Sequence, residues 1–272
     1  MRTLYGKRIL LTGATGTLGA AAARQFLAQG AELILPVRNP QKAEQLRSVL
    51  LELHPRAALS FPLLDLADNA SVRALTRQLI AEGRPLDGLV HNAGIFTRAG
   101  RAAPGGREIH MQVNCNSPLM LTGSLLPLLT MAEEPFVLTV TSLSAFRKNE
   151  DASPTDATRL YAASKRALLL QLLSVAEEMP KVDLLFAHPG VCATGLFLSD
   201  PRQSAYSPAF LRLALPLMKL VFPSPEKACR SILHAAQHAQ NGQLAEPGGL
   251  LHIWGKPALV PLSHRLKNSL ER

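Results

Sequence analysis

Residues Lys7 to Gly19, with the sequence KRILLTGATGTLG, decide the fold of this chain. The apolar run Ile9 to Leu11 predicts a strand that is buried on both faces. Three glycines then predict a tight turn free of side chains, and the pattern from Ala20 to Gln29 predicts a helix. The turn would deliver the chain to a helix N-terminus, where unpaired N–H groups and the helix dipole favour a pyrophosphate. The same glycines could also form an ordinary turn, so the sequence that follows has to decide.

The rest of the chain alternates strand and helix patterns. Further strands are predicted at Glu32–Val37, Leu59–Leu64, Leu86–His91, Phe136–Thr141, Val182–Ala187 and Leu250–Trp254. Further helices are predicted at Gln41–Leu53, Ser71–Ala81, from the end of the loop Gly94–Gly106 to Leu129, and at Thr158–Met179 and Glu226–Gln240. This order predicts an α/β fold: one doubly wound domain over residues 1–272, with a mostly parallel central sheet of about seven strands and helices on both faces. Ligands of such sheets bind beyond the carboxyl ends of the strands.

Composition restricts the class of protein. With 47% hydrophobic and 18% charged residues, the chain is expected to be globular and not disordered. The first strand begins so close to Met1 that no signal peptide is expected, and no apolar run is long enough to predict a membrane span. These features favour a soluble, cytoplasmic protein without stable membrane insertion.

The charged residues and the cysteines favour neither nucleic-acid binding nor a metal site. The net charge is +9, but the basic residues are scattered, which favours a solvated surface over a nucleic-acid interface. Cys115, Cys192 and Cys229 are too far apart for a C-x-x-C metal or redox motif. Three free thiols and no metal are therefore expected.

Polar residues follow several predicted strands, where a ligand would lie. Arg38 follows the second strand at the distance where a dinucleotide-binding fold usually places an acidic residue on the ribose. Because an arginine can hold a 2′-phosphate, NADP(H) is favoured, while NAD(H) stays possible. Asp65 closes the third strand and would either contact the cofactor or cap a turn. His91 closes the fourth strand and is expected to be structural.

The sequence YAASK, from Tyr161 to Lys165, carries the strongest chemical signal. A tyrosine and a lysine four residues apart share one face of a helix, so the ammonium group can lie near the phenol. A cation stabilises the phenolate and lowers the phenol pKa from about 10 toward the range of a working acid or base. As an isolated pair this spacing would carry little weight, so its value depends on the other motifs of the chain.

Further motifs accompany this pair in order: HNAG at 91–94, Asn114, Ser142 after the fifth strand, and PG-x-x-x-T at 189–194. Over Lys7 to Thr194 the chain therefore resembles the short-chain dehydrogenase/reductase family. Its segment LILPVRNPQKAEQL, at 33–46, resembles retinol-dehydrogenase-like members. The resemblance implies a Rossmann fold and hydride transfer between a nicotinamide cofactor and a substrate carbon.

The resemblance also implies a role for each motif residue. Tyr161 would be the general acid in reduction and the general base in oxidation, and Lys165 would lower its pKa and hold the nicotinamide ribose. Ser142 would donate a hydrogen bond to the substrate oxygen, and Asn114 would keep a proton-relay water and Lys165 in place. Cofactor contacts would come from Gly13, Thr15, Gly16, Thr17, Leu18, Gly19, Arg38, Asp65, Leu66, Asn92, Ala93, Gly94, Tyr161, Lys165, Pro189, Gly190 and Thr194.

Two features depart from the usual family pattern. Shorter-chain members have T-G-x-x-x-G-x-G, but here Thr17 stands where the middle glycine is expected. That spacing is closer to the extended branch of nucleotide-sugar epimerases and dehydratases, although the modest length and the HNAG motif favour the shorter branch. The long gap between Ser142 and Tyr161 predicts an extra loop, Phe146 to Thr155, beside the active site.

The segment Gly195 to Pro225 is strongly apolar and is expected to cover the substrate. This favours a lipophilic ketone, aldehyde or secondary alcohol of retinoid, steroid or aliphatic type, although the same residues could pack in the core, form a dimer surface or contact a membrane. The leucine-rich helix Thr158–Met179 could pack against its copy in a homodimer or homotetramer. A non-catalytic NAD(P)-binding sensor or scaffold is the alternative to an enzyme, but it would not need the tyrosine, lysine and serine set.

Overall fold

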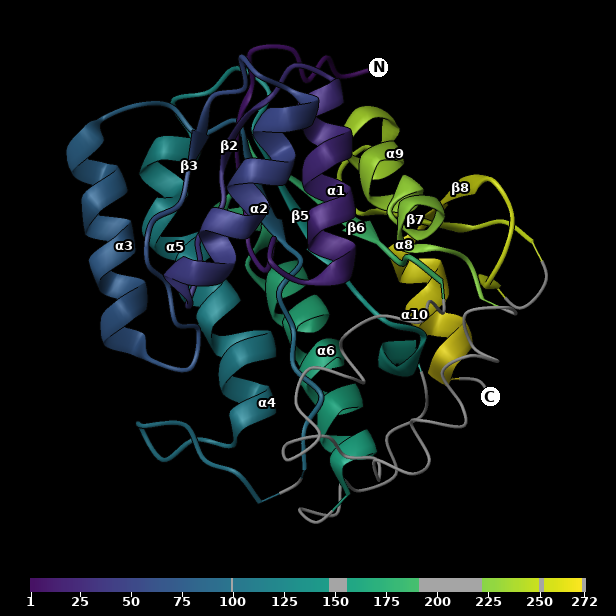
Figure 1. Ribbon diagram of the computed structural model, residues 1–272. Coiled ribbons are helices and arrows are strands. Elements are labelled where there is room, and N and C mark those ends of the chain that lie inside the picture. The colour runs from purple at the N-terminus through teal and green to yellow at the C-terminus, as the bar shows by residue number, and fades with distance from the viewer. Residues whose placement is uncertain (99, 147–155, 191–221, 250–251, 271–272) are drawn as a thin grey trace.

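The structure, a computed structural model, describes residues 1–98, 100–146, 156–190, 222–249 and 252–270. At its centre is one eight-stranded sheet (Figure 1). The strands lie in the order β3 (Leu59–Ser60), β2 (Glu32–Ile34), β1 (Arg8–Leu11), β4 (Gly88–His91), β5 (Phe136–Val140), β6 (Asp183–Ala187), β7 (Gln243–Pro247) and β8 (Pro257–Pro261). Neighbours from β3 to β7 pair in parallel, and β8 is antiparallel to β7. The expected α/β Rossmann architecture is confirmed, with one strand more than expected.

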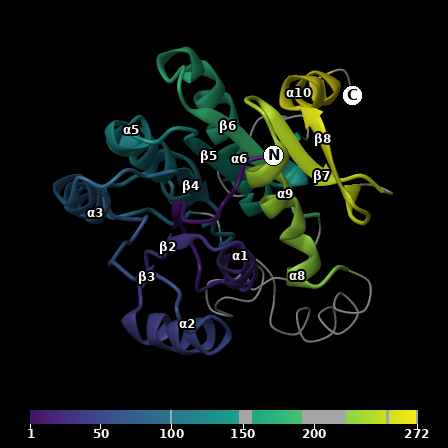
Figure 2. The ribbon, with the colours of Figure 1, turned by 90° about the horizontal axis from the view of Figure 1, so that it is seen from above.

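Helices cover both faces of the sheet. One face carries α1 (Thr17–Ala28), α2 (Pro40–Leu53), α8 (Pro225–Ala228) and α9 (Arg230–His238). The other carries α3 (Asn69–Glu82), α4 (Ile109–Met111), the π-helical turn η1 (Gln112–Asn116), α5 (Ser117–Leu129), α6 (Ala157–Ser174) and α10 (Leu262–Leu270). The short 3₁₀ turns are η2 (Leu143–Phe146) and η3 (Ala176–Glu178). Figure 2 shows α1 and α2 on the opposite side of the sheet from α3 and α5.

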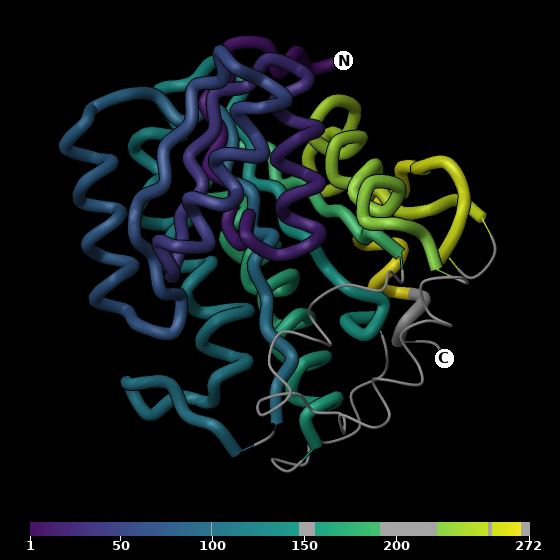
Figure 3. The backbone as a smooth tube through the Cα atoms, in the orientation of Figure 1, coloured from purple at the N-terminus to yellow at the C-terminus, as the bar shows by residue number. Residues whose placement is uncertain are grey.

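The first strand shows why an apolar run forms the centre of this fold. Ile9, Leu10 and Leu11 are all fully buried. Successive side chains of a strand point to opposite faces, and here Leu10 packs in the core on the side of α3 and α5 while Ile9 and Leu11 pack on the side of α1. The segments that follow β1, β4 and β5 reach the edge of the sheet opposite the N-terminus (Figure 3).

The strands next to β1 are shorter than expected. β2 ends at Ile34, before Pro36, whose nitrogen has no hydrogen to donate to a sheet. Pairing resumes as an isolated parallel bridge between Val37 and Leu63. This arrangement carries Arg38 to the same edge of the sheet as the end of β1.

The expected last strand, Leu250–Trp254, is wrong. Its described residues, 252–254, lie in the loop of a hairpin between β7 and β8. Gly248 N donates to Lys256 O (2.9 Å) and Gly249 N donates to Trp254 O (2.8 Å), which closes that loop. The strand is β7, with the sequence QLAEP. Because it contains the charged residue Glu246, it is not an apolar run and was not predicted as a strand.

Several expectations fall on residues outside the described part of the chain. These are most of the extra loop Phe146–Thr155, most of the substrate-covering segment Gly195–Pro225, Cys192 and Thr194. The other two cysteines, Cys115 and Cys229, are buried free thiols. Among the described helices, none combines the length and apolar character that crossing a bilayer requires.

Candidate active site

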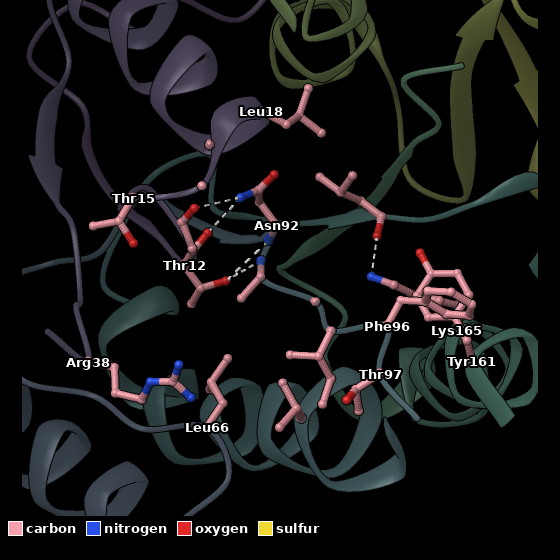
Figure 4. A pocket seen from close by; sticks show the side chains of 18 of the residues that line it. Thr12, Thr15, Leu18, Arg38, Leu66, Asn92, Phe96, Thr97, Tyr161 and Lys165 are labelled. Carbon is pink, nitrogen blue, oxygen red and sulfur yellow. Dashed lines mark hydrogen bonds between the residues drawn. The ribbon is translucent and has the colours of Figure 1, made fainter. Parts of the chain in front are cut away.

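A cavity of about 960 Å³ lies beyond the carboxyl ends of β1, β4, β5 and β6 (Figure 4). Every predicted site residue in the described part of the chain lines it except Asn114. The lining includes Gly13, Thr15, Gly16, Thr17, Leu18, Gly19, Arg38, Asp65, Leu66, Asn92, Ala93, Gly94, Ser142, Tyr161, Lys165, Pro189 and Gly190. Thr194 lies among the residues that are not described.

The glycine turn after β1 is shaped so that two of its positions exclude a side chain. Gly13 has φ +72°, and a Cβ there would lie 2.8 Å from the Cα of Ala93. A Cβ on Gly19 would clash with the carbonyl oxygen of Gly13 and lie 2.8 Å from Asn92 Nδ2. Thr17 is the first residue of α1, a position that ordinary residues adopt. The departure from the family pattern at Thr17 therefore leaves the two most constrained glycines in place.

Thr12 fastens this turn to the end of β4. Its hydroxyl donates to Val90 O (3.2 Å) and accepts hydrogen bonds from the N–H groups of Asn92 (3.2 Å) and Ala93 (3.1 Å). Asn92 Nδ2 in turn donates to Thr12 O at 2.9 Å. Asn92 Oδ1 is buried and accepts no hydrogen bond within the described residues. Thr12, which directly precedes Gly13, is thus a positioning residue, and the spacing of the glycines alone did not reveal it.

Two exposed cations line the cavity next to α2. Arg38 follows β2, and Lys42 lies in the first turn of α2, whose cap Asn39 accepts a hydrogen bond from Lys42 N. Figure 4 shows Arg38 on the same side of the cavity as Thr15, away from Tyr161. The sequence analysis did not identify Lys42. Its position four residues after Arg38, at the start of the predicted helix Gln41–Leu53, is the signal that could have found it.

Asp65 has a structural role, the capping of a turn, which is one of the two roles that the sequence allowed. Its carboxylate accepts a hydrogen bond from Ala67 N (2.9 Å), and its own N–H donates to Ser71 Oγ (2.8 Å). It therefore caps the turn that leads into α3, and it also lines the cavity beside Leu66.

Lys165 and Tyr161 lie on α6 at the other end of the cavity. Lys165 is buried, and its Nζ donates to Val140 O at 3.1 Å. Burial lowers the pKa of Lys165 to about 8, so the ammonium form still predominates at neutral pH. The Tyr161 ring makes an edge-to-face contact with Phe96 at 5.5 Å between centroids, and Figure 4 shows these three side chains together.

Ser142 lies two residues after the end of β5 and is held by Ser144. Its Oγ accepts hydrogen bonds from Ser144 Oγ (3.0 Å) and Ser144 N (3.3 Å). Because both of these bonds use oxygen lone pairs, the hydroxyl hydrogen of Ser142 is available to a ligand in the cavity. Ser144 was not identified from the sequence, and its position two residues after Ser142 is the pattern of a serine turn.

Asn114 acts behind the cavity wall, in the π-helical turn η1. Its Oδ1 accepts from Ile95 N (2.8 Å), and its Nδ2 donates to Ile95 O (3.0 Å) and Ser164 Oγ (3.0 Å). It thereby ties the HNAG segment to α6 next to Lys165. A Cβ on Gly94 would lie 3.2 Å from Lys165 Nζ, so the small residue keeps this contact region open.

His91 is placed as expected of a structural histidine. Its Nε2 lies 2.8 Å from Thr122 Oγ1, which itself donates to Pro118 O, so Nε2 carries the hydrogen of that bond. Burial, and secondarily the nearby Lys165 charge, lower the pKa of His91 to about 3. The side chain is therefore neutral, and it lies outside the cavity lining.

Comparisons with known proteins agree with this geometry. The family model described as short chain dehydrogenase matches residues 7–204. Human dehydrogenase/reductase SDR family member 13 is 30% identical over 87% of this chain and 63% of its own length. The chain thus spans less than two thirds of that relative. Mouse retinol dehydrogenase 14 is 29% identical over 78% of this chain and 71% of its own length.

A solved structure gives the same result. A short chain dehydrogenase from Escherichia coli CFT073, complexed with NADPH, is 29% identical, with a TM-score of 0.62 over 79% of this chain and 92% of that one. Together with the family model, which covers most of the chain, these similarities identify the family. This protein belongs to the short-chain dehydrogenase family.

Proposed function

We propose that this protein is an NAD(P)(H)-dependent oxidoreductase that transfers a hydride between nicotinamide and a lipophilic ketone, aldehyde or secondary alcohol. One observation carries the proposal: Tyr161, Lys165 and Ser142 line the same cavity as the glycine turn after β1. A nucleotide-binding sensor or scaffold would need the turn but not the three polar groups. A nucleotide-sugar enzyme of the extended branch stays the second alternative within the family.

The residues around the glycine turn fit a dinucleotide. Gly13 and Gly19 leave no side chain between the turn and the N-terminus of α1, where unpaired N–H groups suit a pyrophosphate. When bound, the nicotinamide would supply or accept the hydride.

The proton would be handled by Tyr161 and its neighbours. Lys165, buried beside the same cavity and still mostly protonated at neutral pH, would favour the phenolate and so lower the barrier to proton transfer. Ser142 would donate its free hydroxyl hydrogen to the substrate oxygen as negative charge develops there. Asn114, which contacts Ser164 and Ile95, would hold α6 and the HNAG segment in register.

Charge at the other end of the cavity supports NADP(H). Arg38 and Lys42 line it, and neither pairs with a carboxylate in the part of the chain that the structure describes. A 2′-phosphate would supply the missing negative charge. The bound NADPH of the Escherichia coli relative is consistent with this choice.

Apolar lining supports the substrate class. Ile95, Phe96, Val113 and Leu143 line the cavity, and the Phe96 ring contacts the Tyr161 ring. The similarity to retinol dehydrogenase 14 points in the same direction. A cytoplasmic location, a single domain and a homo-oligomer formed through α6 complete the proposal, and the exposed Leu170 on that helix supports the last of these.

The decisive experiment follows NADPH absorbance with the purified protein and a panel of lipophilic ketones and aldehydes. Tyr161→Phe should reduce turnover by about 10²- to 10⁴-fold, because the general acid is lost, while NADPH still binds. Oxidation of NADPH at an undiminished rate by the variant would refute the role of Tyr161. An intact protein that binds NADPH but turns over no carbonyl or alcohol would favour the sensor.

A further inference from the structure

Arg101 is a charged residue of the cavity that the proposed chemistry does not use. It lies in the loop between β4 and α4 and lines the cavity. Its Nη1 donates a hydrogen bond to Thr97 Oγ1 at 3.2 Å. Thr97 directly follows Phe96, whose ring contacts that of Tyr161, and Figure 4 shows these three side chains on the same side of the cavity. The guanidinium of Arg101 therefore belongs to the end of the cavity where a carbonyl would be reduced.

The structure around Arg101 holds this guanidinium in place. Arg101 O accepts a hydrogen bond from Ile109 N (3.0 Å), which closes the loop ahead of α4. Its side-chain acceptor Thr97 is fixed as well, because Thr97 N donates to Nε2 of the buried His110 (3.1 Å). The other ring nitrogen of His110 lies 2.6 Å from Glu108 Oε1. A charged group that is positioned before a ligand arrives loses less entropy when it binds one.

The charges along the cavity wall are unevenly distributed. Among the described residues that line the cavity, four are cations and one is a carboxylate: Arg38, Lys42, Arg101 and Lys165 against Asp65. Asp65 lies toward Arg38, because Leu64 N donates to Val37 O (2.9 Å) and so pairs the two segments that these residues end. Arg101 and Lys165 thus make the opposite end of the cavity positive. This charge favours an anionic group on the molecule that binds there.

The lining next to Arg101 is apolar. Phe96 lies on one side of Thr97 in the chain, and Ala102 and Pro104 follow Arg101 in the loop, and all three line the cavity. A molecule that suits both features has an apolar body and an anionic head group. The planar guanidinium presents several N–H donors that match the two oxygens of a carboxylate. The phosphates of the proposed cofactor would lie at the glycine turn and at Arg38, so this carboxylate would come from the substrate.

We propose that Arg101 binds a carboxylate of the substrate, so that lipophilic oxo acids and hydroxy acids are preferred over neutral ketones and alcohols. This inference rests on the proposed function, because it concerns the substrate of the same cavity. It narrows the substrate class and makes Arg101 a specificity-determining residue.

The test uses the protein loaded with NADPH and two probes that share a ten-carbon chain. Dissociation constants of decanoate and of decan-1-ol are measured by calorimetry for the wild type and for Arg101→Met. The wild type should bind decanoate about tenfold more tightly, because an arginine–carboxylate pair is added to the same apolar contacts. Arg101→Met should lose most of this preference, and Arg101→Lys, which keeps the charge but not the planar donors, should recover part of it. Equal affinity of the wild type for both probes, or a preference kept in Arg101→Met, would overturn the assignment.

The matched control is Arg107→Met. Arg107 is an exposed arginine of the same loop and is not among the described residues that line the cavity, so this variant should keep the preference for decanoate. In turnover, Arg101→Met should raise KM for an oxodecanoic acid more than for its methyl ester. NADPH binding that is weakened in Arg101→Met while the preference is kept would assign the guanidinium to the cofactor and overturn the proposal.

The proposed function can fail separately from this inference. A wild type that binds no NADPH and reduces no carbonyl would refute the proposed function. A wild type that reduces neutral ketones and binds decanoate no more tightly than decan-1-ol would refute the role of Arg101 alone.

Discussion

The two ends of the cavity are built in different ways. At the glycine turn, the shape comes from backbone: Gly13 and Gly19 lack side chains that would collide, and Thr12 fastens the turn to β4. At the opposite end, the wall includes buried polar side chains, of which Lys165 and His188 are each no more than 5% exposed. The backbone end is suited to holding a ligand common to many reactions, whereas the polar end keeps polar groups buried at a cost in folding free energy.

Lys165→Met should break the polar end with the largest effect on activity. Loss of the ammonium removes the support for the Tyr161 phenolate and should lower kcat/KM by about 10²- to 10⁴-fold. The same variant should be more stable than the wild type by about 1–3 kcal/mol at pH 7, because a buried charge is removed. Activity assays and thermal unfolding of the cofactor-free protein measure the two effects.

The stability gain should depend on pH in a defined direction. The pKa of Lys165 is about 8 when folded against an ordinary value of 10.5, so between these values the unfolded chain holds more protons. Wild-type stability therefore rises with pH across that window, and the penalty is fully present below pH 8. The advantage of Lys165→Met should shrink as the pH rises from 8 to 10.5. A constant or growing advantage would contradict a buried ammonium group.

Gly19→Ala should break the backbone end. The added Cβ collides with Gly13 O and crowds Asn92, so the turn must shift. We expect a loss of about 2–4 kcal/mol in unfolding free energy and NADPH binding weakened about tenfold or more. Gly123→Ala is the control: it lies inside α5, where a Cβ meets nothing within 4 Å. Denaturant unfolding of this control should give an unchanged or slightly higher unfolding free energy, and calorimetry should give unchanged NADPH binding.

Arg38→Ala should sharpen the comparison by affecting one cofactor and not the other. Removing a guanidinium from a 2′-phosphate should weaken NADPH binding about tenfold or more, with little effect on NADH. Lys42→Ala should show the same selectivity with a smaller effect. Fluorescence titration with both cofactors measures the two constants, and equal weakening of NADPH and NADH would place the 2′-phosphate elsewhere.

Local patterns predicted the backbone end well and the polar end only in part. The apolar run before the glycines, and the four-residue spacing of Tyr161 and Lys165, are properties of a single strand, turn or helix. The state of a buried polar group depends on partners far along the chain. Glu246 lies in a buried strand where Arg265 and His252 pair with it, and Arg265 comes too far along the chain for a short window around QLAEP to contain it. The missed strand β7 has this origin.

The smallest effect is expected from Arg265→Met, which tests how this remote cluster supports the polar end. Arg265 pairs with the buried Glu246 at 3.1 Å, and its guanidinium lies 5.7 Å from the centre of the Phe146 ring in η2, the turn that follows Ser142. Its loss leaves Glu246 with His252 as its partner, and unfolding free energy should fall by about 1–2 kcal/mol.

The matched control for this ion pair is Arg24→Met, which breaks the exposed pair with Glu226 (2.9 Å). That change should be within about 0.5 kcal/mol of neutral, because water screens exposed charges. A double variant with Glu246→Gln should lose less than the sum of its two single changes, since the carboxylate that Arg265 compensates is then absent. Additive losses would mean that Arg265 stabilises η2 through Phe146 alone, and the charge cluster behind His188 would then be independent of the helix that carries Arg265.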